Sequence, residues 1–417
     1  MKQFNLNLKP GILLRYLIRW GIISIPLALI TGSLVALFLW LLDVVTQYRW
    51  QHMWLLYLLP VAGVGIHFLY RLYGKDAERG NNLIINEIHE PGGGVPLRMA
   101  PLVLATTLLT HLFGGSAGRE GTAVQIGGSM AGGIGQLFKL VEADTRILLM
   151  MGIAAGFGAV FGTPVAGAVF AIEVLVAGKI KFDAFVPCII AGYMGDIVCS
   201  VWGIHHTHYH ISFLVGESSF LHFDILIAFK VLIAGALFGL CARSFALLSH
   251  EVKSMALKYI SVQWLIPVVG GCVIIVLTYL LGTADYLGLG VTSRDVGGIS
   301  ILSAFKAGGV TYWSWLWKLV FTIITLSLGF KGGEVTPLFF IGAALGNTLA
   351  IAMGVPVDMF AALGFIAVFA GATNTPVACT LMGIELFGGE YGLYYALACF
   401  TAFYCSGRAG IYSAQRR

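Results

Sequence analysis

Long runs of apolar residues, separated by shorter polar stretches, dominate the chain. Three clean runs cover Trp20–Leu42, Trp54–Tyr70 and Trp264–Leu281. A fourth run, Ile225–Leu247, is as long but contains Lys230 and Arg243, so its ends are less well defined. A helix needs roughly 20 apolar residues to cross the hydrocarbon core of a bilayer. The pattern therefore predicts an all-α polytopic membrane protein.

The composition agrees with this class. Hydrophobic residues make up 58% of the 417 residues and charged residues only 11%, whereas a soluble domain has about 25% charged residues. So few charges cannot cover a water-facing surface. The net charge of +5 gives no indication of a nucleic-acid partner.

Both ends of the chain are basic. The basic residues there are Lys2, Lys9, Arg15, Arg19, Arg408, Arg416 and Arg417. Because cytoplasmic segments of membrane proteins carry an excess of Lys and Arg, we expect both termini to be cytoplasmic, in a plasma or inner membrane. The first apolar run is too long for a removable signal peptide and has no small-residue cleavage site, so we expect it to be a retained helix.

Cysteines and histidines do not indicate a metal or cofactor. The seven cysteines are odd in number and show no CxxC spacing, which favours buried free thiols. His205, His206, His208 and His210 lie in a polar connection without a nearby cysteine or carboxylate. We interpret this cluster as a solvated loop rather than a metal site.

Two short apolar segments, each beginning after a proline, indicate an internal duplication. Residues 157–178 and 369–390 align so that Thr163-Pro164 matches Thr375-Pro376 and Glu173 matches Glu385, both at an offset of 212 (375 − 163). The segments that follow the prolines, Val165–Leu175 and Val377–Phe387, are too short to span a bilayer. Short, interrupted segments in matching halves predict discontinuous helices that meet near the midplane. We place the approximate repeats at 75–220 and 221–417.

Gly-rich breaks precede each of these segments. The first covers residues 114–128 and the second residues 329–343, and aligning Ile126-Gly127 with Ile341-Gly342 gives an offset of 215 (341 − 126). A helix that begins inside the membrane presents unpaired N–H groups and the positive end of its dipole. Two such N-termini can hold a dehydrated anion without a full cationic side chain. The breaks therefore predict an anion site.

The motifs at these breaks resemble those of the CLC family of anion channels and transporters. Gly118-Arg119-Glu120-Gly121 resembles the GREGP signature, and Gly333-Glu334-Val335-Thr336-Pro337 resembles the GxFxP motif with Val335 in place of phenylalanine. Residues 80–85 occupy the place of the GSGIP motif, and Tyr412 lies in a segment like the one that carries the central tyrosine. The resemblance covers essentially the whole chain.

The resemblance implies a single transmembrane domain over residues 1–417. It implies a CLC-type fold of two inverted-topology repeats with many tilted, discontinuous helices, and a homodimer with one pathway per subunit. The chain stops just after Tyr412, so we expect no C-terminal regulatory domain. Gly118, Arg119, Gly121 and Val335 are the positions that match the anion-contacting motifs.

Glu120 is the strongest candidate functional residue. An ionisable side chain inside a membrane segment is expensive and is by default a functional candidate. At a helix N-terminus its carboxylate is stabilised, while protonation would free the site for another anion. The matching glutamate of the family is the gate that carries the proton. The alternative is a local ion pair with Arg119, which we disfavour because adjacent residues of a helix do not face each other.

Departures from the family pattern resemble its fluoride/proton antiporter branch. Asn81 stands where chloride-handling members have serine, Thr122 replaces the proline of GREGP, and residues 334–336 read Glu-Val-Thr. Fluoride is smaller and more strongly hydrated than chloride, so its dehydration demands more hydrogen-bond donors. Asn81 offers two N–H donors, and Thr122 keeps the backbone N–H that proline lacks. The alternative is that Asn81 and Thr122 only cap helix ends.

Glu334, Thr336 and Tyr412 complete the predicted site. Glu334 is a candidate for a proton or anion pathway, although it would equally stabilise the start of the following helix. Thr336 replaces the common alanine, and Tyr412 would offer its hydroxyl or ring to the anion. Val174 follows Glu173 where the chloride exchangers of the family have a glutamate, so either Glu173 is the internal proton acceptor or protons enter another way. Since Glu385 repeats Glu173, we favour a shared structural role at helix ends for both.

The sequence thus predicts a fluoride/proton antiporter that exports fluoride from the cytoplasm. A chloride/proton exchanger or chloride channel on the same fold is the nearest alternative. An intramembrane enzyme is disfavoured, since His111 is the only histidine near Glu120 and no HExxH-type pair is present.

Overall fold

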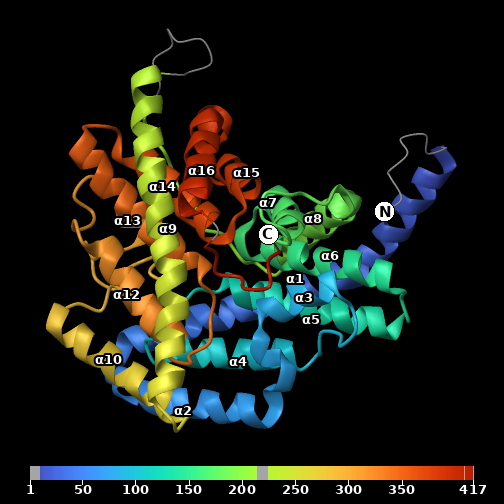
Figure 1. Ribbon diagram of the computed structural model, residues 1–417, viewed down its shortest axis with the longest axis horizontal. Helices are drawn as coiled ribbons and strands as arrows, with labels where there is room; N and C mark the ends of the chain where they lie inside the picture. Colours follow the sequence, from blue (N-terminus) through green and yellow to red (C-terminus); the bar gives the residue numbers. More distant parts are fainter. Residues whose placement is uncertain (1–9, 214–223, 408, 417) are drawn as a thin grey trace.

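The computed structural model describes residues 10–213, 224–407 and 409–416, and these are almost entirely helical (Figure 1). The α-helices are α1 (Pro10–Gln51), α2 (Leu59–Leu69), α3 (Asn81–His89), α4 (Met99–Leu112), α5 (Glu120–Leu137), α6 (Glu142–Phe161), α7 (Pro164–Glu173), α8 (Phe185–Val201), α9 (Ile225–Tyr259), α10 (Leu265–Leu281), α11 (Ile301–Ala304), α12 (Ser314–Ser327), α13 (Val335–Met353), α14 (Val357–Thr373), α15 (Pro376–Phe387) and α16 (Gly392–Ser406). Short stretches of 3-10 helix are η1 (Met53–Leu58), η3 (Lys75–Arg79), η4 (Phe182–Ala184) and η6 (Gly389–Tyr391), and η2 (Tyr70–Gly74) is a short π-helix.

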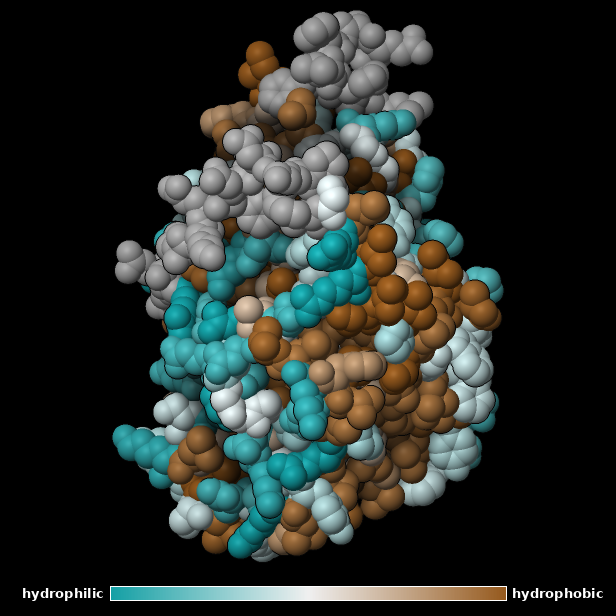
Figure 2. Space-filling view, turned by 90° about the vertical axis from the view of Figure 1, so that its right-hand side faces the viewer, coloured by the Kyte–Doolittle hydropathy of each residue, from teal (hydrophilic) through white to brown (hydrophobic). Residues whose placement is uncertain are grey.

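The described part of the chain contains 6 helical stretches long and apolar enough to cross a membrane. They are Leu14–Gln51, Met53–His89, Glu142–Phe161, Phe182–Val201, Ile225–Tyr259 and Val335–Met353. Large apolar side chains are also exposed to the surroundings, among them Ile22 and Leu29 of α1 and Tyr193 and Ile197 of α8. Figure 2 shows a broad apolar surface on the side of the molecule where α1 and α8 lie. Such a surface suits lipid rather than water.

The predicted apolar runs correspond to helices, with one difference. The runs at Trp20–Leu42 and Ile225–Leu247 lie inside the longer helices α1 and α9, and α10 matches the third. The run at Trp54–Tyr70 is divided, because a 3-10 turn fills Met53–Leu58 before α2 begins with Pro60 in its first turn. Of the basic residues near the ends, Lys2, Lys9, Arg408 and Arg417 lie outside the described residues.

Both predicted short segments are short helices, α7 and α15, which lie side by side near the centre of Figure 1. Each follows the same sharp break. Gly162 ends α6 with φ 69° and Asn374 ends α14 with φ 57°, and both residue types tolerate this left-handed conformation. A Thr-Pro pair then starts the next helix, with the proline in the first turn, where a missing N–H costs nothing.

The helix before each break also packs in the same way in both halves. A Cβ on Gly127 of α5 would collide with the backbone of Gly152 in α6, and a Cβ on Gly342 of α13 would collide with the backbone of Gly364 in α14. Gly127 and Gly342 are the positions that the sequence alignment matched. Close helix contact through small residues is the usual packing of membrane helices. The repeat boundaries at 75–220 and 221–417 stay a prediction that this packing supports.

Candidate ion-transport site

Two chain breaks, far apart in sequence, are joined by backbone hydrogen bonds at the centre of the site. The amide of Gly118 donates to the carbonyl of Gly333 at 2.6 Å, and the amide of Gly333 donates to the carbonyl of Gly118 at 2.8 Å. A Cβ on Gly118 would lie only 2.9 Å from the Gly333 carbonyl oxygen. Glycines are therefore needed for this approach. The result is that α5 and α13 begin next to each other.

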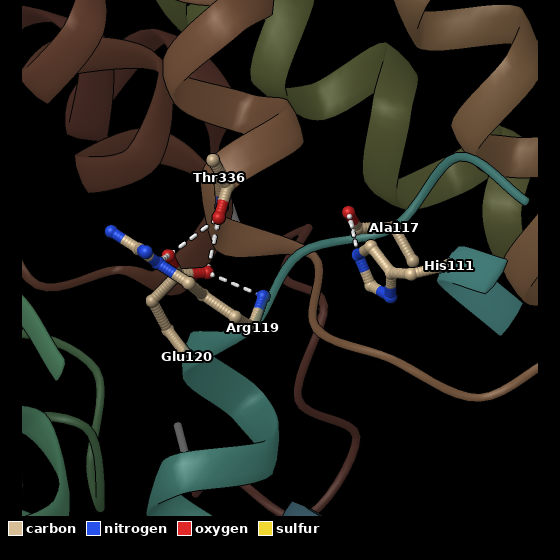
Figure 3. A network of polar contacts seen from close by, with 5 residues as sticks. All are labelled: His111, Ala117, Arg119, Glu120 and Thr336. Carbon is tan, nitrogen blue, oxygen red and sulfur yellow. Dashed lines mark hydrogen bonds and ion pairs between the residues drawn. The ribbon is translucent and has the colours of Figure 1, made fainter. Parts of the chain in front are cut away.

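Glu120 is the first residue of α5, and its carboxylate lies against the first turn of α13 (Figure 3). The side chain is 1% exposed. Oε2 accepts from the Thr336 amide at 3.0 Å and from the Arg119 amide at 3.1 Å, and Oε1 accepts from the Thr336 hydroxyl at 2.5 Å. The carboxylate thus occupies donors at a helix N-terminus, where the helix dipole favours negative charge.

The Glu120 carboxylate occupies donors that another anion could also use. In the structure it accepts hydrogen bonds from both the N–H and the O–H of Thr336. Protonation removes the charge that the two donors stabilise. A small anion of suitable size could then accept the same hydrogen bonds. The geometry supports exchange between a proton on Glu120 and an anion on Thr336.

Arg119 differs from the sequence-based expectation. We disfavoured an ion pair with Glu120, but Nε of Arg119 lies 3.6 Å from Oε1 of Glu120. The physical reason is that Arg119 is the residue before the helix, with φ −115°, and not part of its first turn. The geometry that separates adjacent helical side chains does not apply there. The ion pair and the contacts to Thr336 coexist.

Asn81 and Glu334 approach Gly121 from different elements. A Cβ on Gly121 would lie 3.3 Å from Nδ2 of Asn81 and 3.8 Å from Oε2 of Glu334. Asn81 begins α3, while Glu334 immediately precedes α13. The Oδ1 atom of Asn81 is buried without a hydrogen-bond partner. The structure therefore brings both residues to the start of α5, next to Glu120.

Thr122 is placed differently from the rest of the predicted site. It is fully buried, and its hydroxyl lies 2.8 Å from the hydroxyl of Thr107 in α4. Its side chain therefore faces α4, and only its backbone N–H belongs to the free end of α5. Neither Thr122 nor Asn81 is the capping residue of its helix, since Arg119 and Gly80 hold those positions without a side-chain cap.

Val335 and Tyr412 border the site. Val335 is the first residue of α13 and is 2% exposed. Tyr412 is buried, and its ring meets the ring of Phe170 edge-on at a centroid distance of 6.5 Å. The segment around it is held by the Ile411 amide, which donates to the Ala372 carbonyl at 2.9 Å.

His111 supports the site in a way that the sequence did not indicate. It is 1% exposed, and its Nδ1 lies 2.8 Å from the Thr107 carbonyl oxygen. Its Nε2 lies 3.0 Å from the Ala117 carbonyl oxygen (Figure 3). It thereby fastens the loop between α4 and Glu120. The sequence suggests a role for this histidine only under the intramembrane-enzyme alternative. Its spacing from Ala117 carries no recognisable motif, so only the structure reveals the contact.

Glu173 and Glu385 have the shared structural role that we favoured. Glu173 accepts from the amides of Val377 and Ala378 at 3.0 and 2.8 Å. In the other half, Glu385 accepts from the amides of residues 165 and 166 at 3.0 and 2.7 Å. Each glutamate thus caps the short helix of the opposite half. Val174, which follows Glu173, is 1% exposed and offers no proton acceptor.

The histidine cluster lies in a connection without helical structure, in which His205, His208 and His210 are exposed. Its one ion-pair contact joins His206 Nε2 to Asp196 Oδ1 at 3.5 Å. No group of three or more metal-binding side chains occurs among the residues that the structure describes.

Comparison with known proteins identifies the family. The family model of voltage gated chloride channels matches residues 62–407. The chain belongs to the CLC family. A CLC relative from Pseudomonas syringae pv. tomato, described as a chloride/fluoride channel protein, is 46% identical over 410 residues, which are 97% of this chain and 88% of the relative.

Solved CLC structures agree with the fold. The crystal structure of a CLC-type fluoride/proton antiporter matches with a TM-score of 0.89 and 34% identity, over 98% of this chain and 99% of that one. A slow cyanobacterial Cl⁻/H⁺ antiporter matches with a TM-score of 0.77 and 20% identity, over 95% and 96% of the two chains, which shows the shared fold. The predicted all-α, multi-span CLC-type fold is confirmed. Membership of a CLC family of channels and transporters also removes the intramembrane-enzyme alternative.

Proposed function

We propose that this CLC protein is a fluoride/proton antiporter that exports fluoride from the cytoplasm in exchange for protons. The observation that carries the proposal is the position of the Glu120 carboxylate on the N–H and O–H of Thr336. A titratable anion there competes directly with a transported anion. Two relatives, one described as a chloride/fluoride channel protein and one as a fluoride/proton antiporter, support the choice of ions.

The exchange follows from the alternation of two ligands at one helix N-terminus. When Glu120 takes up a proton, its attraction to the α13 N-terminus falls, and the donors of Thr336 become available to fluoride. When the proton leaves, the carboxylate returns and displaces the anion. Each cycle therefore couples the movement of a proton on Glu120 to the movement of a fluoride ion. Glu120 acts as the gate and proton carrier, and Gly118, Gly121 and Val335 supply close backbone at the two helix starts.

Fluoride selectivity is attributed to the density of donors. Dehydration of a small, strongly hydrated anion must be offset by hydrogen bonds within the site. Thr336 offers an N–H and an O–H, and the Nδ2 group of Asn81 lies at the start of α5. Thr122 contributes its backbone N–H alone, because its hydroxyl bonds Thr107. Glu334, beside Gly121, is assigned to the proton or anion path, and Tyr412 borders the anion.

The proposal includes the setting of the protein. Both termini are placed in the cytoplasm of a cell whose plasma or inner membrane holds the protein, and two copies form a homodimer with one pathway each. The helix packing through glycine is compatible with close contacts between subunits. Cross-linking in native membranes is expected to give a dimer. Recovery of monomer alone would contradict that part.

The direct test is ion movement from proteoliposomes, followed with fluoride and chloride electrodes under an imposed pH gradient. We expect the gradient to drive fluoride uphill and to move chloride much less. Chloride movement at a comparable proton-coupled rate would favour a chloride/proton exchanger. Passive movement of either anion without proton coupling would favour a channel.

A further inference from the structure

Arg49 is a buried arginine for which the described part of the chain provides no partner. It lies in the last turn of α1, and its side chain is 5% exposed. Its Nε is buried without a hydrogen bond, and no hydrogen bond or ion pair joins its guanidinium to another described residue. Buried charges are normally paired, because an isolated one is costly. An unpaired guanidinium therefore points to a partner other than the described residues, and a bound anion would supply the opposite charge.

Two glycines make room for this guanidinium. A Cβ on Gly288 would lie 3.1 Å from Nη2 of Arg49, and one on Gly114 would lie 3.7 Å from Nη1. Both glycines have positive φ, 60° and 89°, which L side chains rarely adopt. The Gly288 amide donates to the Gly115 carbonyl at 3.1 Å. We call Gly114 and Gly288, which surround the guanidinium, the Arg49 cradle. This hydrogen bond connects the cradle to the segment that leads directly to Glu120.

A second buried cation lies on the other side of Gly288. Lys318 of α12 is 0% exposed, and its Nζ donates to the carbonyls of Tyr286 at 3.1 Å and Gly288 at 2.7 Å. No carboxylate forms an ion pair with Lys318 or Arg49 among the described residues. Two buried positive charges around one glycine repel each other, so an anion beside them would lower the electrostatic cost of both.

Arg49 faces an open pocket of about 430 Å³ whose wall also includes Arg119. The Nε of Arg119 is likewise buried without a hydrogen bond, and it lies 3.6 Å from Oε1 of Glu120. The pocket therefore reaches from the Arg49 cradle to the neighbour of the gating carboxylate. Its volume far exceeds the roughly 30 Å³ of one water molecule, so a hydrated anion fits.

The aspartates of the pocket leave Arg49 and Arg119 without an aspartate partner among the described residues. Asp43, Asp285 and Asp295 also line it. Asp285 accepts from the hydroxyls of residues 283 and 293 and from the amide of residue 299. Asp43 accepts from Gln47, and Asp295 is paired with Arg294 at its exposed rim. None of the three pairs with Arg49 or Arg119 within the described ranges.

We propose that this pocket binds a small monovalent anion of the halide class on the Arg49 guanidinium, as a waiting site on the way to Glu120. A guanidinium presents several N–H donors and is weakly hydrated, which suits a buried anion contact. The pocket lies at the end of α1 remote from the N-terminus. The inference rests on the proposed function for the identity of the transported anion. It also rests on the proposed cytoplasmic N-terminus, which would put the pocket on the outer side of the membrane.

The binding test uses bromide, whose anomalous scattering locates it in crystals. Wild-type crystals soaked in bromide are expected to show a peak beside Arg49, and Arg49→Met crystals are expected to lose it. Arg294→Met is the matched control, because Arg294 lines the same pocket but pairs with Asp295. It is expected to keep the peak. Arg49→Lys retains the charge and is expected to retain bromide, which separates lost binding from altered folding.

The transport test asks whether the site lies on the path. In oriented proteoliposomes, Arg49→Met is expected to raise the half-saturating fluoride concentration on the pocket side by about ten-fold or more, because a charge-assisted contact is lost. The half-saturating fluoride concentration on the opposite side of the membrane should change much less. Arg294→Met should behave like the wild type.

Each arm can overturn the proposal. A bromide peak that persists in Arg49→Met, or no peak in the wild type, rules out binding on Arg49. A peak in the wild type with unchanged half-saturation in Arg49→Met means an adventitious ion only. Failure of the proposed function appears separately, as wild-type liposomes in which a pH gradient drives no fluoride, and the bromide result stands without it.

Discussion

Helix N-termini from the two halves of the chain meet in two places, at α7 with α15 and at α5 with α13. The residues at the first pair are alike in both halves, whereas those at the second pair differ. At α7 and α15 the halves kept the same residues, and Glu173 and Glu385 cap each other's helices through four backbone N–H groups. At α5 and α13 the halves diverged, so that one supplies the acid Glu120 and the other supplies the donors of Thr336.

The difference separates support from function. In the symmetric, reciprocal pair each glutamate accepts two backbone N–H groups of the opposite half, and these bonds join the two halves. In the asymmetric pair the Glu120 carboxylate lies on the donors of Thr336, which under the proposed function a transported anion uses in its place. Both rest on the same physics, a carboxylate at a helix N-terminus. Only at α5 and α13 does the proposed function make that carboxylate compete with a transported anion.

Replacing the titratable carboxyl group of Glu120 should have the largest effect on transport. Glu120→Gln is expected to abolish proton coupling, because an amide resembles the protonated acid but releases no proton. Proton flux and fluoride flux would be recorded together in liposomes. Fluoride movement that persists without proton movement would agree with the prediction. Proton transport at the wild-type rate would remove Glu120 from the mechanism.

Removal of one donor from the opposite helix should reduce selectivity. Thr336→Val keeps the shape but loses the hydroxyl that bonds Glu120. A hydrogen bond to a charged group is worth about 1.5–3 kcal/mol, so the fluoride-over-chloride ratio should fall about ten-fold or more. Thr336→Ser is the control that keeps the hydroxyl. Equal ratios in the two variants would show that the hydroxyl is not used.

The symmetric pair should respond in stability instead. Glu173→Gln and Glu385→Gln each replace a carboxylate that accepts two backbone N–H groups, and each should cost about 1–2 kcal/mol. Thermal unfolding in detergent would measure the loss, with the exposed Glu390→Gln as control. Fluoride selectivity in the surviving protein should be unchanged. A selective loss of coupling in Glu173→Gln would instead return that residue to the proton path.

The smallest effect is expected at Thr122. Thr122→Val removes the hydroxyl that bonds Thr107 and should leave the fluoride-over-chloride ratio unchanged. Thr122→Pro also removes the backbone N–H and should lower the ratio by about five-fold, as one lost donor is worth about 1 kcal/mol. Electrode measurements on both variants test this division. An equal fall in both would assign the effect to the hydroxyl after all.

The outcome for individual residues explains how far sequence reasoning extended. The breaks at 163–164 and 375–376 were predictable, because Thr-Pro after a residue that tolerates positive φ acts within a few positions. The positions of Glu120 and Thr336 at adjacent helix starts also followed from the motifs. The direction of the Thr122 side chain did not, because it depends on Thr107 in another helix.

By itself, the sequence determined the membrane class, the helix breaks and the residues at them, since these depend on local composition and backbone preference. The tertiary structure alone decided which groups meet across those breaks. It placed Glu120 on Thr336 and each structural glutamate on the opposite half, and it left Arg49 without a partner among the described residues. Each of these outcomes depends on residues that are far apart in the sequence. A local sequence pattern does not determine how close such residues lie in the folded protein.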